Sequence, residues 1–121
     1  MTNPAEGPTQ GGESRKEKAL SRDDMADIML EAQAKLGIYN PSRKTLLGAL
    51  TVATRPRRSE LTPVRAGVGP PFLYYPTKAF QEDSIRITLG EILNDNFFPR
   101  EDKDRWIEES LRILEERHRN I

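Results

Sequence analysis

The sequence predicts a small α+β domain that is mainly α, with two helices joined by a short turn, then a β-hairpin and two C-terminal helices. Apolar residues recur at three- and four-residue spacing in residues 21–36 and 99–119. Two short β-rich runs flank a turn of glycines and prolines at residues 67–71. With 121 residues and no cysteine, the chain is expected to hold one modest core without disulfides.

Residues 1–18 contain Pro4, Gly7 and Pro8, and no branched or aromatic apolar residue follows Met1. Such a segment buries too little surface to offset its ordering entropy, so we expect a disordered tail. Residues 19–121 then form a single small domain. Within it, residues 19–76 hold the helix pair and the hairpin, and residues 77–121 hold the C-terminal helices.

The chain lacks an apolar run of about 20 residues, the length of a membrane span, and its N-terminal residues lack the apolar core of a signal peptide. We therefore expect a soluble, cytoplasmic protein that does not enter a membrane.

The first helix is expected to begin after Ser21, because Ser21 and Asp24 have the spacing of a capping box. Gly37 suits a left-handed residue that ends the helix. The apolar stripe between them is typical of a core-facing helix and consists of Met25, Ile28, Met29, Ala32 and Leu36.

The second helix follows after about four residues. Asn40 can cap it with Pro41 as the first helical residue, and Ser42 is a competing cap. This spacing matches a helix-turn-helix layout and equally an ordinary helical hairpin. The exposed start of the helix consists of Ser42, Arg43, Lys44 and Thr45.

Residues 54–60 have no apolar anchor, so the sequence predicts an exposed loop that carries Arg55, Arg57 and Arg58. Residues 61–66 and 72–75 are predicted as the two strands of the hairpin. Pro63 cannot donate to a β-ladder, which places its strand at an edge. Tyr74 and Tyr75 are expected on opposite faces of the second strand.

A third helix is predicted to begin near Asp83 or Ser84, although the alternation in residues 85–89 would also fit a strand. Pro99 is expected to open the last helix, of about twenty residues. The apolar face of this helix can pair with a second copy of the chain, which would give a homodimer, or fold back on the domain.

The net charge of the whole chain is zero, but its distribution is uneven. Residues 40–80 hold seven Lys/Arg and one Glu, a net charge of +6, whereas residues 1–39 carry −2 and residues 81–121 carry −4. The basic segment is a candidate surface for nucleic acid. Alternatively, its side chains cover a solvated face that is paired to the acidic C-terminal helix.

The sequence gives little basis for catalysis, cofactors or metals. His118 is the only histidine and is expected to lie exposed at a helix end. Adjacent acidic residues such as Glu108 and Glu109 point about 100° apart on a helix, so they predict solvated faces rather than a shared site. We therefore expect a protein that is not an enzyme.

Residues 25–76 resemble winged helix-turn-helix DNA-binding regulators, through the helix pair and the run from Arg65 to Pro76, in which a basic Gly/Pro turn precedes an aromatic strand. The resemblance implies that Ser42, Arg43, Lys44 and Thr45 face the major groove, and that Arg65, Gly67 and Gly69 approach backbone or minor groove. Arg55, Arg57 and Arg58 would then contact phosphates.

On this hypothesis the protein is a sequence-specific transcriptional regulator that binds double-stranded DNA as a homodimer through its C-terminal helix. The alternative is a non-enzymatic protein-interaction module, an adaptor or a phage- or plasmid-type accessory protein. Its anchor would be the aromatic residues Tyr39, Phe72, Tyr74 and Tyr75, with the basic loop facing an acidic partner.

Overall fold

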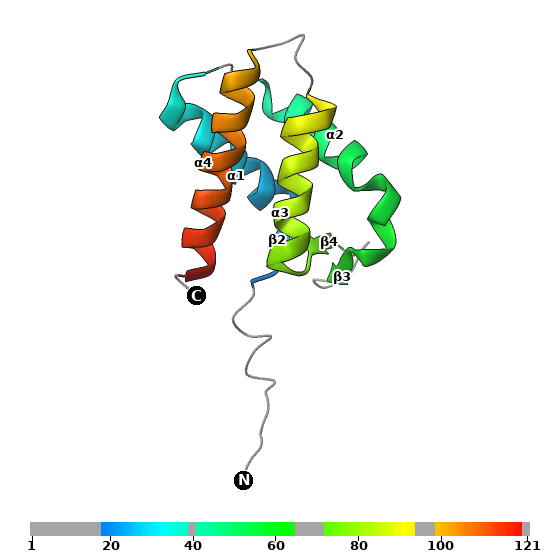
Figure 1. Cartoon of the computed structure of the whole chain (residues 1–121). Helices are drawn as coiled ribbons and strands as arrows, with labels where there is room; N and C mark the ends of the chain where they lie inside the picture. The colour runs from blue at the N-terminus through cyan, green and yellow to red at the C-terminus, as the bar shows by residue number, and fades with distance from the viewer. Residues whose placement is uncertain (1–17, 39–40, 65–71, 94–98, 120–121) are drawn as a thin grey trace.

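The computed structural model describes residues 18–38, 41–64, 72–93 and 99–119. Within these ranges the chain forms four α-helices, which are α1 (Arg22–Leu36), α2 (Arg43–Thr54), α3 (Lys78–Ile87) and α4 (Arg100–Arg119). A 3-10 helix, η2 (Arg55–Glu60), continues α2, and a π-helical turn, η3 (Thr88–Ile92), continues α3. The strands are β2 (Leu20–Ser21), β3 (Thr62–Val64) and β4 (Phe72–Tyr75). A mainly helical α+β fold is therefore confirmed (Figure 1).

Both ends of α1 follow the sequence-based prediction. The Ser21 hydroxyl accepts a hydrogen bond from the Asp24 amide at 3.1 Å, and the Asp24 carboxylate accepts one from the Ser21 amide at 3.2 Å. Gly37 ends the helix at φ 64°, a left-handed conformation that suits glycine. The capping box and the glycine stop are confirmed.

Helix α2 is capped by Ser42, whose hydroxyl accepts from the Thr45 amide at 3.1 Å. The helix begins at Arg43, so the prediction of Pro41 as its first residue was wrong; Asn40 lies outside the described residues. The loop predicted for residues 54–60 was wrong in conformation, because Arg55–Glu60 form 3-10 turns with a kink at Arg57, whereas its predicted exposure is confirmed at most positions, including Arg55 and Arg58. Pro56 has no N–H to donate to the Val52 carbonyl, so the α-helical ladder cannot continue there.

The three strands form one antiparallel sheet in the order β2-β4-β3. In the hairpin Pro63 pairs with Leu73, and β3 lies at the edge as Pro63 predicted. Strand β2 was not predicted: it pairs Leu20 with Tyr75 on the other side of β4. Tyr75 is buried and Tyr74 is half-buried, consistent with opposite faces.

Helix α3 begins earlier than the sequence suggested. Thr77 caps it by accepting a hydrogen bond from the Phe80 amide at 3.2 Å, so the start is Lys78 rather than Asp83 or Ser84. Residues 85–89 are helical, which excludes the alternative of a strand. The last turn widens in η3, where the Leu93 amide donates to the Thr88 carbonyl at 3.0 Å.

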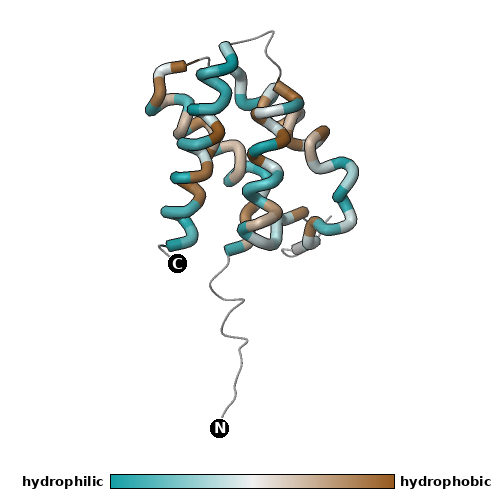
Figure 2. The backbone as a smooth tube through the Cα atoms, in the orientation of Figure 1, coloured by the Kyte–Doolittle hydropathy of each residue, from teal (hydrophilic) through white to brown (hydrophobic). Residues whose placement is uncertain are grey.

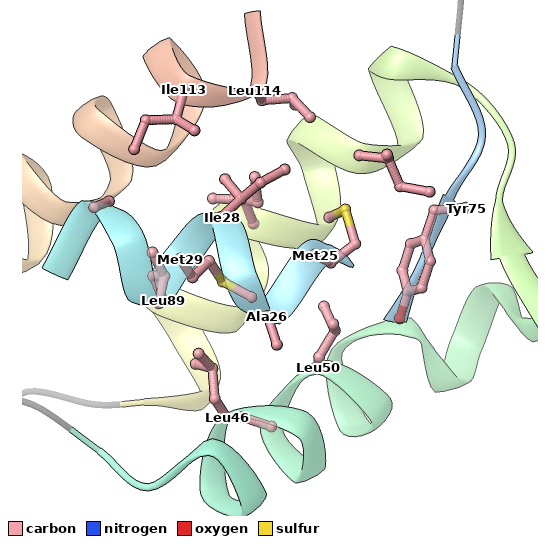
Figure 3. Close-up of a cluster of buried hydrophobic side chains, with 14 of the residues drawn as sticks. Met25, Ala26, Ile28, Met29, Leu46, Leu50, Tyr75, Leu89, Ile113 and Leu114 are labelled. Carbon is pink, nitrogen blue, oxygen red and sulfur yellow. The ribbon is translucent and has the colours of Figure 1, made fainter. Parts of the chain in front are cut away.

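The core lies where the four helices meet, with α1 in contact with each of the other three (Figure 3). The α1 residues Met25, Ile28 and Met29 are fully buried. Around them pack side chains from the other helices and from β4, including Leu46, Leu50, Tyr75, Leu89, Ile113 and Leu114. Figure 2 shows that apolar and hydrophilic residues alternate along the helices, as expected for helices with one buried side.

Helix α4 lies against α1 and α3, and in Figure 1 it runs antiparallel to α3. Its apolar side is buried within the chain, through residues that include Trp106, Ser110, Ile113 and Leu114. The alternative in which this helix folds back on the domain is therefore the one observed. A homodimer through the same apolar face finds no support in this packing.

Within the described ranges, none of the helices combines the length and the apolar composition needed to cross a bilayer.

Candidate nucleic-acid interface

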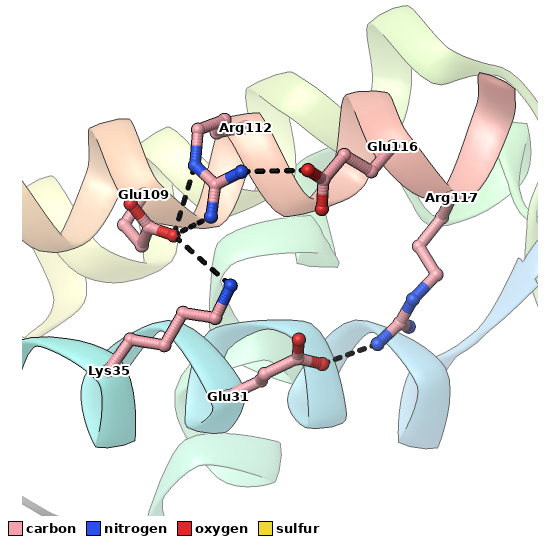
Figure 4. A network of polar contacts seen from close by, with 6 residues as sticks. All are labelled: Glu31, Lys35, Glu109, Arg112, Glu116 and Arg117. Atoms are coloured by element: carbon pink, nitrogen blue, oxygen red, sulfur yellow. Dashed lines mark hydrogen bonds and ion pairs between the residues drawn. The ribbon is translucent and has the colours of Figure 1, made fainter.

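The acidic residues of α4 form ion pairs mostly with α1 and with α4 itself (Figure 4). Arg112 pairs with Glu109 and, at 2.8 Å, with Glu116. Two ion pairs join α1 to α4. Lys35 Nζ of α1 lies 3.9 Å from Glu109 Oε2 of α4, and Arg117 Nη2 of α4 lies 2.5 Å from Glu31 Oε1 of α1.

For the described part of the basic segment 40–80, only Lys78 pairs with α4, through Glu115. The alternative in which α4 neutralises the whole basic segment therefore does not hold.

Arg43, a predicted groove-facing residue, is held by carboxylates of α1. Its Nη1 lies 2.5 Å from Asp27 Oδ1, and its Nη2 lies 3.3 Å from Asp23 Oδ1. The hydrogen bond to Asp27 raises the pKa of Arg43. Arg43 thus links the starts of α1 and α2, and its charge is matched by two acidic neighbours.

Arg57 is also engaged within the chain. Its guanidinium donates to both carboxylate oxygens of Glu60, at 2.8 and 2.9 Å, and to Asp83 at 3.1 Å. The guanidinium carbon lies 4.4 Å above the ring of Phe80, a cation–π distance. These hydrogen bonds, first those with Glu60, raise the pKa of Arg57. Arg57 fixes η2 to α3 and is poorly placed to contact phosphate.

The remaining described cations of the predicted site, Lys44, Arg55 and Arg58, are exposed. None of the three forms a hydrogen bond or ion pair with another described residue. Ser42 and Thr45 are exposed at the same end as Lys44, and the Ser42 hydroxyl donates to the Thr45 hydroxyl at 2.9 Å.

One side of α2 carries Lys44, Gly48, Thr51 and Val52, and Arg55, the first residue of η2, continues it at the same helical spacing. We call this stripe, together with Arg58 on η2, the α2 face. Residues 41–59 contain no Asp or Glu, so the face carries no carboxylate of its own.

Two further features distinguish the α2 face. Val52 is 42% exposed, the highest among the described large apolar residues. Gly48 is exposed in the middle of the helix, and a Cβ added there would meet no atom within 4 Å. No described contact within the chain therefore requires glycine at this position.

Arg55 and Arg58 also border a small pocket of about 40 Å³. Its other lining residues are Arg22, Thr51, Thr54 and Leu61. Arg22 was missed by the sequence analysis, because it lies more than thirty positions from Arg55 in the chain and outside the net-basic segment. The pocket thus brings three arginines together from the start of α1 and from η2.

Arg65, Gly67 and Gly69, predicted at the tip of the hairpin, lie outside the described residues, as does Tyr39. The side chain of Phe72 is likewise outside them. Tyr75 is only 1% exposed, so its assignment as an exposed anchor for a partner was wrong. It packs edge-on against Phe80, and burial raises the pKa of its hydroxyl.

His118 was predicted as an exposed helix end, which was wrong. It is buried against α3, and its Nε2 lies 2.6 Å from Gln81 Oε1. Its Nδ1 accepts a hydrogen bond from the Lys18 amide at 3.3 Å. The described residues contain no group of three or more His, Asp or Glu side chains arranged to hold a metal ion.

Comparisons of the chain with family models, with curated proteins and with solved structures gave no match. The winged-helix resemblance of residues 25–76 therefore stays a hypothesis that rests on this chain alone. The geometry adds a selection among the basic residues: within the described ranges Arg43 and Arg57 form ion pairs, whereas Lys44, Arg55 and Arg58 form none.

Proposed function

We propose that the protein binds double-stranded DNA through the α2 face. The observation that carries this proposal is an exposed helix side with cations at both ends and no carboxylate, on which Lys44, Arg55 and Arg58 have no partner among the described residues. Binding to DNA is dominated by the release of counterions when such cations meet phosphates. An exposed, unpaired cation can contact a phosphate and displace its counterion at the least free-energy cost, because no ion pair within the protein has to break first.

The dimensions of α2 suit the major groove of B-DNA. From Lys44 to Arg55 the helix rises by about 17 Å, at 1.5 Å per residue, and the groove is about 12 Å wide and admits one helix. Lys44 and Arg55 then approach phosphates on the two sides of the groove. Between them the side chains are small or apolar, and Gly48 permits the backbone to come close to the bases.

The finer assignment, a sequence-specific transcriptional regulator, follows the winged-helix resemblance. In that arrangement α1 and α2 are the helix-turn-helix, and the β3–β4 hairpin is the wing. Thr45 and Thr51 offer hydroxyls, and Val52 offers an apolar contact for a thymine methyl group. These groups are the candidates for base recognition, whereas Lys44, Arg55 and Arg58 position the protein on the backbone.

The test is fluorescence anisotropy with a labelled random-sequence duplex at about 50 and about 200 mM salt, the range over which phosphate contacts change affinity strongly. We expect binding at low salt that weakens steeply at high salt. The double variant Lys44→Gln with Arg55→Gln should reduce the slope of log affinity against log salt by about 1.8, since each phosphate contact contributes about 0.9.

The matched control removes two charges from α4, as Arg105→Gln with Arg119→Gln, and should leave the slope unchanged. Absence of binding at low salt would refute the proposal and leave the protein-interaction module as the better hypothesis. An equal reduction of the salt slope in the two double variants would mean that DNA is attracted to positive charge anywhere on the protein. The α2 face would then have no special role.

A further inference from the structure

Three of the six residues that line the pocket beside η2 are arginines, namely Arg22, Arg55 and Arg58. None of the six is acidic. Like charges that converge on a small pocket repel one another unless an anion lies between them. The chain supplies no such anion among its described residues, since Arg55 and Arg58 have no partner there.

The two threonines in the pocket wall use their hydroxyl protons within α2, so the arginines are the side chains that can donate hydrogen bonds to a ligand. The Thr51 hydroxyl donates to the Leu47 carbonyl at 2.9 Å, and the Thr54 hydroxyl donates to the Leu50 carbonyl at 3.0 Å. The threonine protons are therefore directed into α2. In contrast, Arg22 Nε and the hydroxyl of Tyr75, which interacts with Arg22, are both fully buried, and neither has a hydrogen-bond partner among the described residues. A buried donor without an acceptor is costly, which favours a ligand that brings oxygen atoms.

The position of η2 is fixed by contacts that do not involve the pocket. Arg57, between the two pocket arginines in sequence, is bound to Glu60 and Asp83 and lies over Phe80. The backbone that carries Arg55 and Arg58 is therefore held in place before any ligand arrives. Preorganised donors bind an anion with a smaller loss of conformational entropy.

We propose that this pocket binds one phosphate group, with Arg22, Arg55 and Arg58 as its hydrogen-bond donors. Arginine is suited to this ligand because its planar fork matches two phosphate oxygens. A volume of about 40 Å³ accommodates a few oxygen-sized groups. If the phosphate belongs to a DNA backbone, this proposal rests on the proposed function. A free phosphate or a phosphomonoester would offer the same chemistry to the pocket.

The experiment is an NMR titration of the full chain with inorganic phosphate, following the arginine Nε–H signals. Sodium chloride at matched ionic strength is the reference. We expect saturable shifts of the Arg22, Arg55 and Arg58 signals with phosphate and only small, linear ones with chloride. Responses of equal size to the two salts would overturn the proposal.

Variants assign the response to the pocket. Arg55→Gln and Arg58→Gln alter exposed side chains and should each weaken phosphate binding at least tenfold. Arg86→Gln removes an exposed arginine from α3, outside the pocket lining, and should leave it unchanged. If Arg55→Gln and Arg58→Gln bind phosphate as the unaltered chain does, the pocket is not the site. Arg22→Gln is informative only where its amide spectrum remains that of the folded chain, so the two η2 variants decide the question.

A parallel titration with a duplex distinguishes the source of the phosphate and separates the two proposals. If DNA shifts the same Nε–H signals and inorganic phosphate competes with it, the ligand is a backbone phosphate. If phosphate saturates the pocket and no duplex binds, the pocket proposal stands and the proposed function fails. If a duplex binds through Lys44 while the pocket signals respond to neither ligand, the reverse is true.

Discussion

The imidazole of His118 and the side-chain amide of Gln81 meet at 2.6 Å, between Nε2 and Oε1, in a buried position where α4 ends against α3. The amide nitrogen of Gln81 also donates to the Lys18 carbonyl at 2.7 Å and to the Tyr75 carbonyl at 2.8 Å. Because His118 Nδ1 accepts from the Lys18 amide, its Nε2 carries the proton and donates to Gln81. One network thus joins both C-terminal helices to the segment before β2 and to the end of β4.

Replacement of His118 by Leu should destabilise the fold by about 1–3 kcal/mol, because Gln81 Oε1 and the Lys18 amide lose their partner in a buried place. Chemical denaturation at neutral pH measures this difference. The exposed neighbour Arg119 provides the control, and Arg119→Gln should have little effect. Equal stability of the two variants would show that the network contributes nothing.

Trp106, the only tryptophan, is fully buried and donates its indole N–H to the Met29 carbonyl of α1 at 2.7 Å. Trp106→Phe keeps an aromatic ring but loses this hydrogen bond and some volume, so we expect a loss of about 1–3 kcal/mol in unfolding free energy. Tryptophan fluorescence of the unaltered chain should also resist acrylamide quenching until the protein unfolds. Efficient quenching in the folded state would contradict the burial.

Features encoded by neighbouring residues could be predicted from the sequence. Ser21 and Asp24 form their capping box within one helical turn, and Gly37 stops α1 through its own backbone conformation. Pro63 marks an edge strand because it lacks an N–H. A further local signal was overlooked: Thr77 caps α3 ahead of Phe80, which begins the buried side that Ile85 and Leu89 continue.

Features that depend on distant residues could not be predicted in this way. Strand β2 is only two residues long and forms by pairing Leu20 with Tyr75, so no propensity within residues 20–21 indicates it. The burial of His118 depends on Gln81, 37 positions away. In the candidate site, whether a basic residue is free to contact a ligand depends on whether the fold brings an acidic residue to it, as it brings Asp27 to Arg43. The sequence therefore identifies a basic segment, but it cannot separate cations that are paired in the fold, such as Arg43, from those that are not.

Arg57 and Arg58 should behave differently, although they are adjacent and carry the same charge. Arg57→Gln removes the ion pairs to Glu60 and Asp83 and the contact with Phe80, so we expect a lower thermal midpoint. Arg58→Gln should leave the midpoint unchanged and lower DNA affinity. Differential scanning fluorimetry and anisotropy on the same preparations make the comparison. A loss of affinity without a loss of stability in Arg57→Gln would place Arg57 in the interface instead.

This contrast argues against the double charge reversal Arg57→Glu with Arg58→Glu as a test of binding. Glu at position 57 would face Glu60 and Asp83, so it would destabilise η2 and confuse binding with folding. Arg55→Gln and Arg58→Gln are the cleaner variants.

Stability should fall in acid through the ion pairs of α4. The hydrogen bond from Arg112, and then the charge of Lys35, lower the pKa of Glu109, and the hydrogen bond from Lys78 lowers the pKa of Glu115. A carboxylate with a lowered folded-state pKa stabilises the fold above its unfolded pKa, about 4.3, and loses this contribution as the pH falls through the folded value. Thermal midpoints should thus decline below about pH 4.3.

Glu109→Gln should show a shallower decline between neutral pH and pH 3, because the paired carboxylate is gone. The neighbouring Glu108 is exposed and has no ion pair among the described residues, so Glu108→Gln serves as the matched control and should keep the original profile. Identical profiles for all three proteins would exclude Glu109 as a contributor.

Gly48 offers a test in which stability and binding should move in opposite directions. Glycine in a helix interior costs about 0.5–1 kcal/mol relative to alanine, and a Cβ at Gly48 would meet no atom of the chain within 4 Å. Gly48→Ala should therefore raise the unfolding free energy by about that amount in chemical denaturation. A decrease would mean that the helix needs glycine for its own structure.

Gly48→Leu extends this test to the interface. The larger side chain also points into open space, so the fold should tolerate it, whereas a helix lodged in the major groove would be pushed away from the bases. We expect duplex affinity to fall at least tenfold, with a smaller loss for Gly48→Ala. Ala34→Leu adds apolar bulk at an exposed position of α1, outside the α2 face, and should leave the affinity unchanged. If Gly48→Leu binds DNA as tightly as the unaltered chain, α2 does not approach the duplex through this face.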